Sequence, residues 1–142
     1  MDLEKLQEMA DKDLAINNTE LDLESLKTPQ LHNKYMKHYT KFKLMLTKAE
    51  TDYNQLKKDK WEYYTGKSDA SVYAQKPFDL KILRTDIDKY IEADEELIRG
   101  KQKCEYLSTC VDYLDKTIRQ ISNRTFTIKN AIDWQRFTSG AV

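Results

Sequence analysis

Apolar residues recur at alternating spacings of four and three between residues 35 and 63, the pattern of a helix that buries one stripe. The stripe consists of Tyr35, Tyr39, Phe42, Leu46, Ala49, Tyr53, Leu56, Lys60 and Tyr63, and Lys60 is its only cation. Upstream, Thr28 can act as an N-cap, and Pro29 loses no hydrogen bond at the first helical position. The pattern predicts a long basic helix over 28–64.

A second apolar stripe follows residues 65–77, a segment rich in small polar residues that we expect to be a loop. The stripe consists of Leu80, Leu83, Ile87, Tyr90, Ile91, Leu97, Cys104, Leu107, Val111, Leu114, Ile118 and Ile121. It predicts a second helix over 78–122. A shorter amphipathic helix is expected over 3–16, whereas 17–26 fits a strand as well as a helix.

The predicted first helix is too long for a compact monomer. It would span ~54 Å at 1.5 Å per residue, whereas a compact chain of 142 residues has a diameter near ~37 Å. The helix must fold back in a hairpin or be covered by other subunits. We therefore expect an all-α fold in one helical domain, 1–142, whose centre is a long helical hairpin.

A short C-terminal helix, 124–142, is expected to mediate assembly. If 126–138 is helical, Phe126, Trp134 and Phe137 lie on one arc, and Ile128, Ala131 and Ile132 lie on another. One arc can be buried within the subunit, and the other needs a partner; core packing within a monomer is the alternative. The predicted oligomerisation residues are Phe126, Ile128, Ile132, Trp134 and Phe137.

Composition narrows the class of protein. Only three Gly and two Pro occur in 142 residues, which argues against a many-stranded fold, and no apolar run is long enough for a membrane span. The acidic N-terminus does not resemble a signal peptide, so a soluble, cytoplasmic protein is expected. Cys104 and Cys110 lack zinc-ligand spacing and are expected to be reduced thiols.

The zero net charge conceals four charged blocks. An acidic N-terminal segment, 1–26, holds eight acids and two lysines, and residues 27–67 hold ten lysines and four acids. Residues 68–98 are again acidic and 99–142 basic. The basic block can bind a polyanion, although a solvated helical bundle with blocky charge is equally compatible with this pattern.

Lysines and aromatic residues alternate at the end of the predicted first helix, in residues 57–67. Lysines can contact phosphates there, and rings can stack on the bases of a single strand. The predicted DNA-binding residues are Lys57, Lys58, Lys60, Lys67, Trp61 and Tyr64; core packing is the alternative for the aromatic ones. Lys60 falls on the apolar stripe without an evident partner, so its removal is expected to leave stability unchanged or higher.

No residue pattern in the sequence supports an enzymatic function. His32 and His38 point in different directions on a helix, and Gly66-Lys67-Ser68 lacks the strand and the first glycine of a P-loop. The acidic run 94–96 is expected to be solvated. No catalytic residue, metal site or cofactor is predicted.

Three segments of the chain resemble the UvsY family, the recombination mediators of T-even-like bacteriophages. They are the opening LEKLQE at 3–8, KKDKWEYYTGKSD at 57–69 and SNRTFTIKNAIDWQRFTSG at 122–140. The resemblance implies a ring of six or seven subunits that binds single-stranded DNA in the cytoplasm of an infected host. It further implies loading of a RecA-like, UvsX-like recombinase onto DNA covered by the phage single-strand-binding protein.

The resemblance also implies roles for individual positions. A Lys-x-Arg pair that carries DNA and partner binding in the family falls on Lys58 and Lys60, where Lys60 replaces the planar guanidinium fork with an ammonium group. The family's C-terminal region mediates assembly. A structural coiled-coil adaptor or chaperone with a basic surface remains the alternative function.

Overall fold

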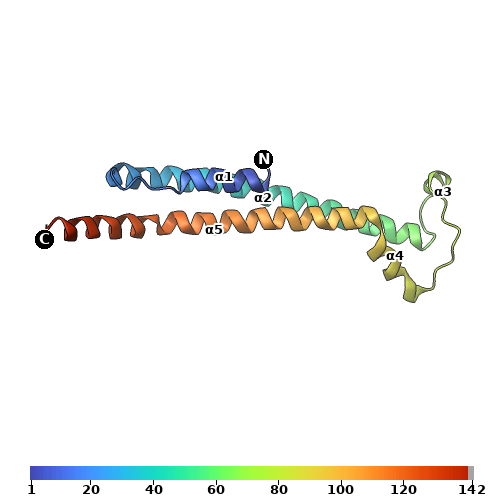
Figure 1. The fold of residues 1–142 in the computed structure, drawn as a ribbon. Helices are drawn as coiled ribbons and strands as arrows, with labels where there is room; N and C mark the ends of the chain where they lie inside the picture. The colour runs from blue at the N-terminus through green and yellow to red at the C-terminus, as the bar shows by residue number, and fades with distance from the viewer. Residues whose placement is uncertain (141–142) are drawn as a thin grey trace. The chain divides into compact units, whose positions relative to one another are not determined.

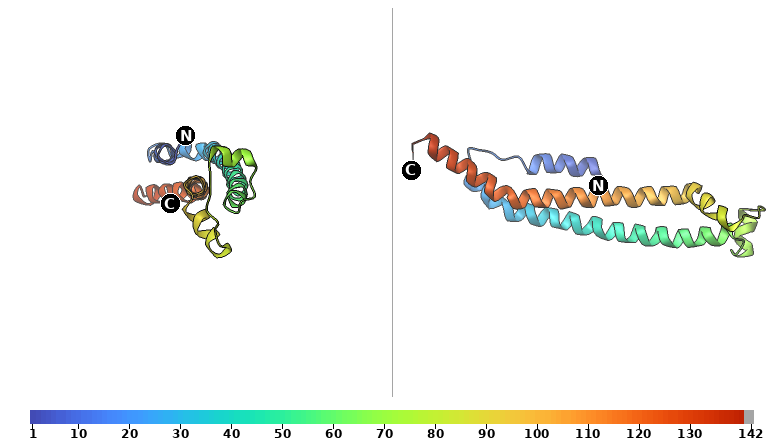
Figure 2. Two further views of the ribbon diagram at one scale, coloured as in Figure 1. Left: turned by 90° about the vertical axis from the view of Figure 1, so that its right-hand side faces the viewer. Right: turned by 90° about the horizontal axis from the view of Figure 1, so that it is seen from below.

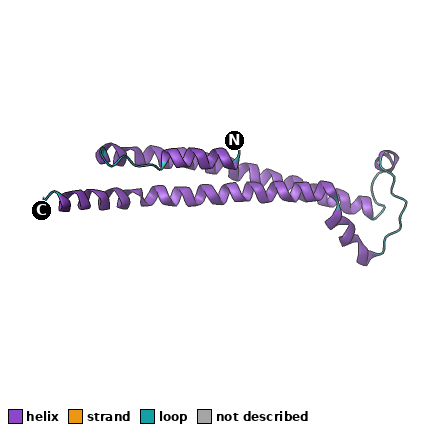
Figure 3. Cartoon of the chain, in the orientation of Figure 1, coloured by secondary structure: helices purple, strands orange, loops and turns teal. Residues whose placement is uncertain are grey.

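The chain folds into helices, and the computed structural model describes residues 1–140, which contain no strand (Figure 3). The elements are α1 (Leu3–Asp13), α2 (Leu21–Tyr64), α3 (Ala70–Gln75), the 3-10 helix η1 (Arg84–Asp86), α4 (Ile87–Ala93) and α5 (Glu95–Thr138). None of the described helices is long and apolar enough to span a bilayer. The predicted all-α class is confirmed.

The chain divides into two compact units. The first combines Met1–Lys43 with Thr109–Val142, of which 141–142 lie outside the described residues; the second is Leu44–Ser108. Both α2 and α5 contribute a part to each unit (Figure 1).

In the first unit, α1 packs with the first part of α2 and the last part of α5 (Figure 2). Asp2 caps α1 by accepting a hydrogen bond from the backbone N–H of Lys5 at 2.9 Å. At the other end of α1, Asp13 accepts from Lys34 Nζ at 2.7 Å and from the Tyr35 hydroxyl at 2.9 Å. The buried core comprises Leu6, Ala10, Leu21, Tyr35, Phe42, Cys110, Val111, Leu114, Ile121 and Ile128.

The start of α2 differs from the prediction: the helix begins at Leu21, and Pro29 lies inside it. A proline within a helix removes one backbone hydrogen bond, so the turns before it need support from elsewhere. Arg124 of α5 supplies it by donating to the carboxylate and the backbone carbonyl of Glu24 and to Thr28 Oγ1. Thr28 therefore accepts from Arg124 inside a helix that starts earlier.

The second unit contains a helical hairpin in which the last part of α2 and the first part of α5 lie side by side (Figures 1 and 2). Its buried apolar residues are Leu46, Ala49, Ile87, Leu97 and Leu107. The helices approach closely at Gly100, where an added Cβ would lie 3.2 Å from Tyr53 Cδ2. All nine predicted stripe positions of α2 are buried or half-buried in their own unit, as the spacing predicted.

The connection between α2 and α5 corrects two predictions. The expected loop 65–77 contains α3, and the expected helix 78–122 is broken into η1, α4 and α5. Leu80 and Leu83 are 63% and 71% exposed, so they do not belong to the second buried stripe. The break falls at Asp94, whose backbone is extended and whose side chain caps the start of α5.

No separate C-terminal helix is present within the described residues, because α5 continues without a break to Thr138. Neither Gly nor Pro occurs between residues 101 and 139 to end it. The buried stripe also continues through Arg124 and Ile128, so packing favours the same helix. Residues 124–138 of the predicted segment 124–142 are thus the last part of a 44-residue helix, and residues 141–142 lie outside the described residues.

Candidate nucleic-acid interface

The end of α2 is shaped by Gly66, which adopts a positive φ of 76°. The backbone N–H of Lys67 donates to the carbonyl of Glu62 at 2.8 Å, and that of Gly66 donates to Tyr63 at 3.3 Å, the two bonds of a Schellman motif. The turn brings the chain back along the last turn of the helix. As a result, the Lys67 ammonium lies 4.5 Å from the centre of the Trp61 ring.

Trp61 and Lys67 line a groove of about 790 Å³ within the second unit. The segment after α3 and the start of α4 form the rest of the groove, with Lys81 and Arg84 as further cations. The remaining lining residues are Tyr64, Thr65, Gly66, Phe78, Asp79, Leu80, Ile82, Ile87 and Asp88. The groove therefore combines aromatic and apolar surface with three cationic side chains and two aspartates, and a net positive groove with aromatic surface is suited to single-stranded nucleic acid.

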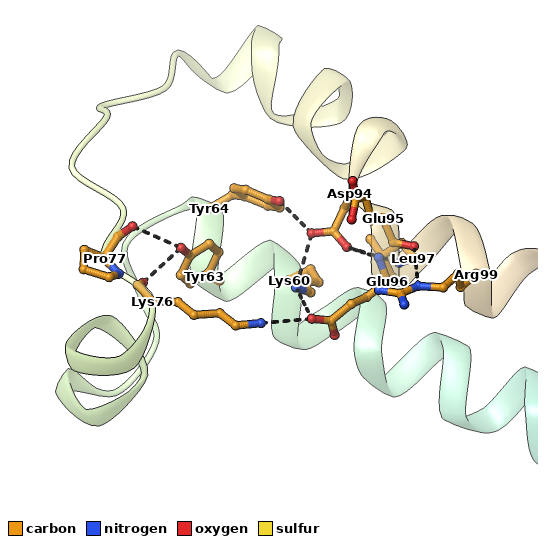
Figure 4. Close-up of polar contacts among 10 residues, drawn as sticks. All are labelled: Lys60, Tyr63, Tyr64, Lys76, Pro77, Asp94, Glu95, Glu96, Leu97 and Arg99. Carbon is orange, nitrogen blue, oxygen red and sulfur yellow. Dashed lines mark hydrogen bonds and ion pairs between the residues drawn. The ribbon is translucent and has the colours of Figure 1, made fainter.

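A network of charged residues lies beside the groove, centred on Asp94 (Figure 4). The Tyr64 hydroxyl donates to Asp94 at 2.6 Å, and Lys60 Nζ lies 3.2 Å from the same carboxylate. Glu96 lies 3.4 Å from Lys60 and 3.1 Å from Lys76. The other oxygen of Asp94 accepts from the first backbone N–H groups of α5, at 3.0 and 3.1 Å.

The network shifts the pKa values of its members. Burial pushes the pKa of Asp94 upward, but the hydrogen bonds from Tyr64 and Leu97 and the charge of Lys60 outweigh it and leave the pKa below its ordinary value. Lys76 and Lys60 lower the pKa of Glu96. Burial and the neighbouring Asp94 raise the pKa of Tyr64. At neutral pH, Asp94 is ionised and Tyr64 is a hydrogen-bond donor.

An aromatic cluster fixes the chain that follows α2. Tyr63 stacks on Tyr73 of α3 at 5.5 Å between ring centres, and the Tyr73 hydroxyl donates to the Tyr63 carbonyl at 2.8 Å. Phe78 contacts Tyr63, Tyr64 and Tyr90 at 5.3–6.0 Å. These contacts hold the segment that forms the far wall of the groove.

The structure separates the six predicted DNA-binding residues into two groups. Lys57, Lys58 and Lys67 are exposed, and Trp61 is 41% exposed at the groove. Lys60 and Tyr64 are instead engaged in the network, with only 15% of the Lys60 side chain accessible.

The expectation that Lys60 carries an uncompensated charge is wrong, because two carboxylates from α5 and its cap face it. The expectation that residues 94–96 are solvated is wrong for Asp94, which is 8% exposed.

Sequence reasoning missed Lys81 and Arg84. Both lie in the acidic block 68–98, in the segment predicted to be part of one helix over 78–122. The aromatic cluster and the hydrogen bonds from the Tyr63 hydroxyl to the carbonyls of Lys76 and Pro77 bring this segment against the end of α2. No local pattern in the sequence placed the two cations in one groove with Trp61.

The predicted assembly residues lie in the first unit and are also of two kinds. Phe126, Trp134 and Phe137 are 66%, 65% and 75% exposed, and Ile132 is 37% exposed. Ile128 is 2% exposed in the core of its own unit, so it is not available for contact with a second subunit. On the arc of Ile128 and Ile132, Ile128 is therefore buried and Ile132 is exposed.

Comparison with known proteins identifies the protein family of this helical chain. Residues 9–141 match the family model described as "Recombination, repair and ssDNA binding protein UvsY". The chain belongs to the UvsY family, a family of recombination and repair proteins that bind single-stranded DNA.

The relatives found are phage proteins. The chain is 24% identical to the "Recombination protein uvsY" of Enterobacteria phage T4 over 140 residues, which is 99% of each protein. Two crystal structures of the bacteriophage T4 recombination mediator protein UvsY share its fold, with TM-scores of 0.85 and 0.82 at 24% and 23% identity. The first alignment covers 98% of both chains; the second covers 97% of this chain and 99% of the T4 chain.

Replacing Lys60 by Ala is expected to lower the free energy of unfolding by about 2 kcal/mol, because Asp94 would keep a buried charge with fewer partners. The matched control is Lys89→Ala, which removes an exposed lysine paired with Asp86 in the same unit and should cost less than about 0.5 kcal/mol. Urea denaturation of both variants measures the difference. Equal stability of the two variants would contradict the assigned role of the network.

The stability of the second unit is expected to depend on the protonation of Asp94. Because the folded pKa is lowered, the stabilisation is fully present above about pH 4 and is lost as the pH falls through the folded pKa. Thermal unfolding of the native chain and of Asp94→Asn between pH 6 and pH 2 tests this. The variant should lose less stability over the acid range; parallel curves would show that another carboxyl controls the transition.

Proposed function

We propose that this protein is a recombination mediator that binds single-stranded DNA and loads a RecA-like recombinase onto DNA covered by a single-strand-binding protein. The observation that carries the proposal is the groove beside α2, whose lining combines aromatic and apolar surface with three cations and two aspartates. Membership in a family of single-stranded-DNA-binding recombination proteins supports it. So does the name "recombination mediator" borne by the T4 protein of the same fold.

The contacts to DNA are divided between the groove and the exposed helix end. Lys67, Lys81 and Arg84 in the groove, with Lys57 and Lys58 on α2, would neutralise phosphates. Lys60 contributes by holding Asp94, and Tyr64 by closing the groove wall, rather than by touching DNA.

We further propose that the protein acts as a homo-oligomeric ring of six or seven subunits. The last part of α5 exposes three large apolar side chains, Phe126, Trp134 and Phe137. Exposed apolar surface of this kind marks a site of contact with another protein chain. Trp134 and Phe137 contact one another at 5.8 Å between ring centres and form a contiguous patch. Several DNA sites held in one ring would bind one strand with avidity.

Removing the three cations of the groove is expected to weaken DNA binding and its dependence on salt. If five side chains each neutralise one phosphate, the slope of log K against log salt is about −3.5 per engaged subunit, and Lys67→Ala/Lys81→Ala/Arg84→Ala should bring it to about −1.4. The control removes the same number of exposed cations from the first unit, Lys5→Ala/Lys116→Ala/Lys129→Ala. Titration of labelled poly-dT at rising salt gives both slopes.

The same titration separates the mediator from the adaptor. A native chain that fails to bind poly-dT at low salt would favour the structural coiled-coil adaptor or chaperone. Equal slopes for the two triple variants would show that DNA does not bind at the groove. For a mediator, the groove variant should also fail to promote recombinase filaments on protein-coated DNA.

Truncating the exposed aromatic patch is expected to dissociate the assembly without unfolding the chain. Trp134→Ala/Phe137→Ala removes surface that is already exposed within the subunit, so the helix content should be retained. The control is Leu44→Ala, an equally exposed apolar side chain in the second unit. Sedimentation velocity should show a loss of mass for the double variant alone; an unchanged mass would exclude this patch from the interface.

A further inference from the structure

Trp61 differs from Tyr64 and Phe78, the other aromatic residues of the groove, because its ring is not packed against other aromatic rings or held by a buried carboxylate within the described residues. Tyr64 is held by Asp94, and Phe78 and Tyr64 pack edge to face at 5.3 Å. Trp61 is 41% exposed, and the ammonium group of Lys67 lies over its ring, 4.5 Å from the ring centre. A flexible, charged side chain therefore covers a large aromatic face at the edge of a groove.

The groove has room for more than a side chain. Its volume of about 790 Å³ falls in the range of pockets that hold small organic ligands. Leu80, Ile82 and Ile87 give it apolar surface, and Lys67, Lys81 and Arg84 outnumber Asp79 and Asp88, so the lining carries net positive charge. A flat, apolar ring attached to an anion fits this combination, and a nucleotide of single-stranded DNA is such a ligand.

We propose that the groove receives a base of the bound strand, which stacks on Trp61 in place of Lys67, and that Lys67 then pairs with an adjacent phosphate. This inference rests on the proposed function and specifies how its site holds the strand. An exposed cation–π contact is weaker than the stacking of a base on an aromatic ring. The exchange also gives the displaced ammonium a phosphate, so neither group loses a partner.

The arrangement selects single strands over duplex. A base can enter the groove only when it is unpaired and free to leave its neighbours, and a duplex must spend unpairing energy first. The lysines alone would accept either form, because they read phosphates and not bases. Trp61 thus supplies the preference and Lys67 contributes affinity.

The test compares two oligonucleotides that carry the same number of phosphates: oligo-dT and an abasic strand of equal length. Binding of each is measured by fluorescence anisotropy for the native chain, Trp61→Leu, Trp61→Phe and Lys67→Ala. Leu retains apolar packing without a ring, and Phe retains a smaller ring. The control is Tyr106→Ala, an aromatic residue of α5 in the same unit that is 43% exposed and does not line the groove.

The native chain and Tyr106→Ala should prefer oligo-dT over the abasic strand by at least about fivefold, the value of one stacked base. Trp61→Leu should abolish the preference with no more than a twofold change in abasic affinity, and Trp61→Phe should retain part of it. Lys67→Ala should weaken both strands by the same factor or keep a larger preference for oligo-dT, because the ring is uncovered.

Two results would overturn the inference. One is a native chain that binds both strands equally, and the other is a Trp61→Leu variant whose preference equals that of the native chain. Either would leave the proposed function intact as long as both strands bind with a steep salt dependence. Failure of the native chain to bind either strand would instead overturn the proposed function itself.

Discussion

The second unit depends on the interactions of one buried carboxylate, that of Asp94. One of its oxygens caps α5, and the other accepts from the Tyr64 hydroxyl and faces Lys60. It therefore joins the end of α2 to the beginning of α5. A carboxylate is tolerated at 8% exposure only because donors surround it on both sides.

The groove is a consequence of this joint and of the turn at Gly66. With Tyr64 held inward by Asp94, Trp61 is left at the surface, one turn earlier on the same helix. The positive φ of Gly66 returns the chain so that Lys67 covers Trp61. Two lysines of similar local sequence therefore have different environments: Lys60 stabilises the fold, and Lys67 is exposed beside the groove.

The fold is shared with T4 UvsY structures at 23–24% identity, with TM-scores of 0.82 and 0.85. Helical pairs of this kind require apolar residues of suitable volume at the seam and tolerate many choices elsewhere. Residues outside the seam can therefore differ between family members, and Lys81, Arg84 and Trp61 are such residues.

The sequence by itself determined the helical class, the buried stripe of α2 and the end of that helix, because spacing and a C-terminal glycine act over a few residues. It did not determine the start of α2 or the break before α5. Those follow from Arg124 with Glu24 and Asp94 with Tyr64, contacts that span 100 and 30 residues. Only the tertiary structure brings such groups together, and their burial then decides which charges are paired in the fold and which remain exposed.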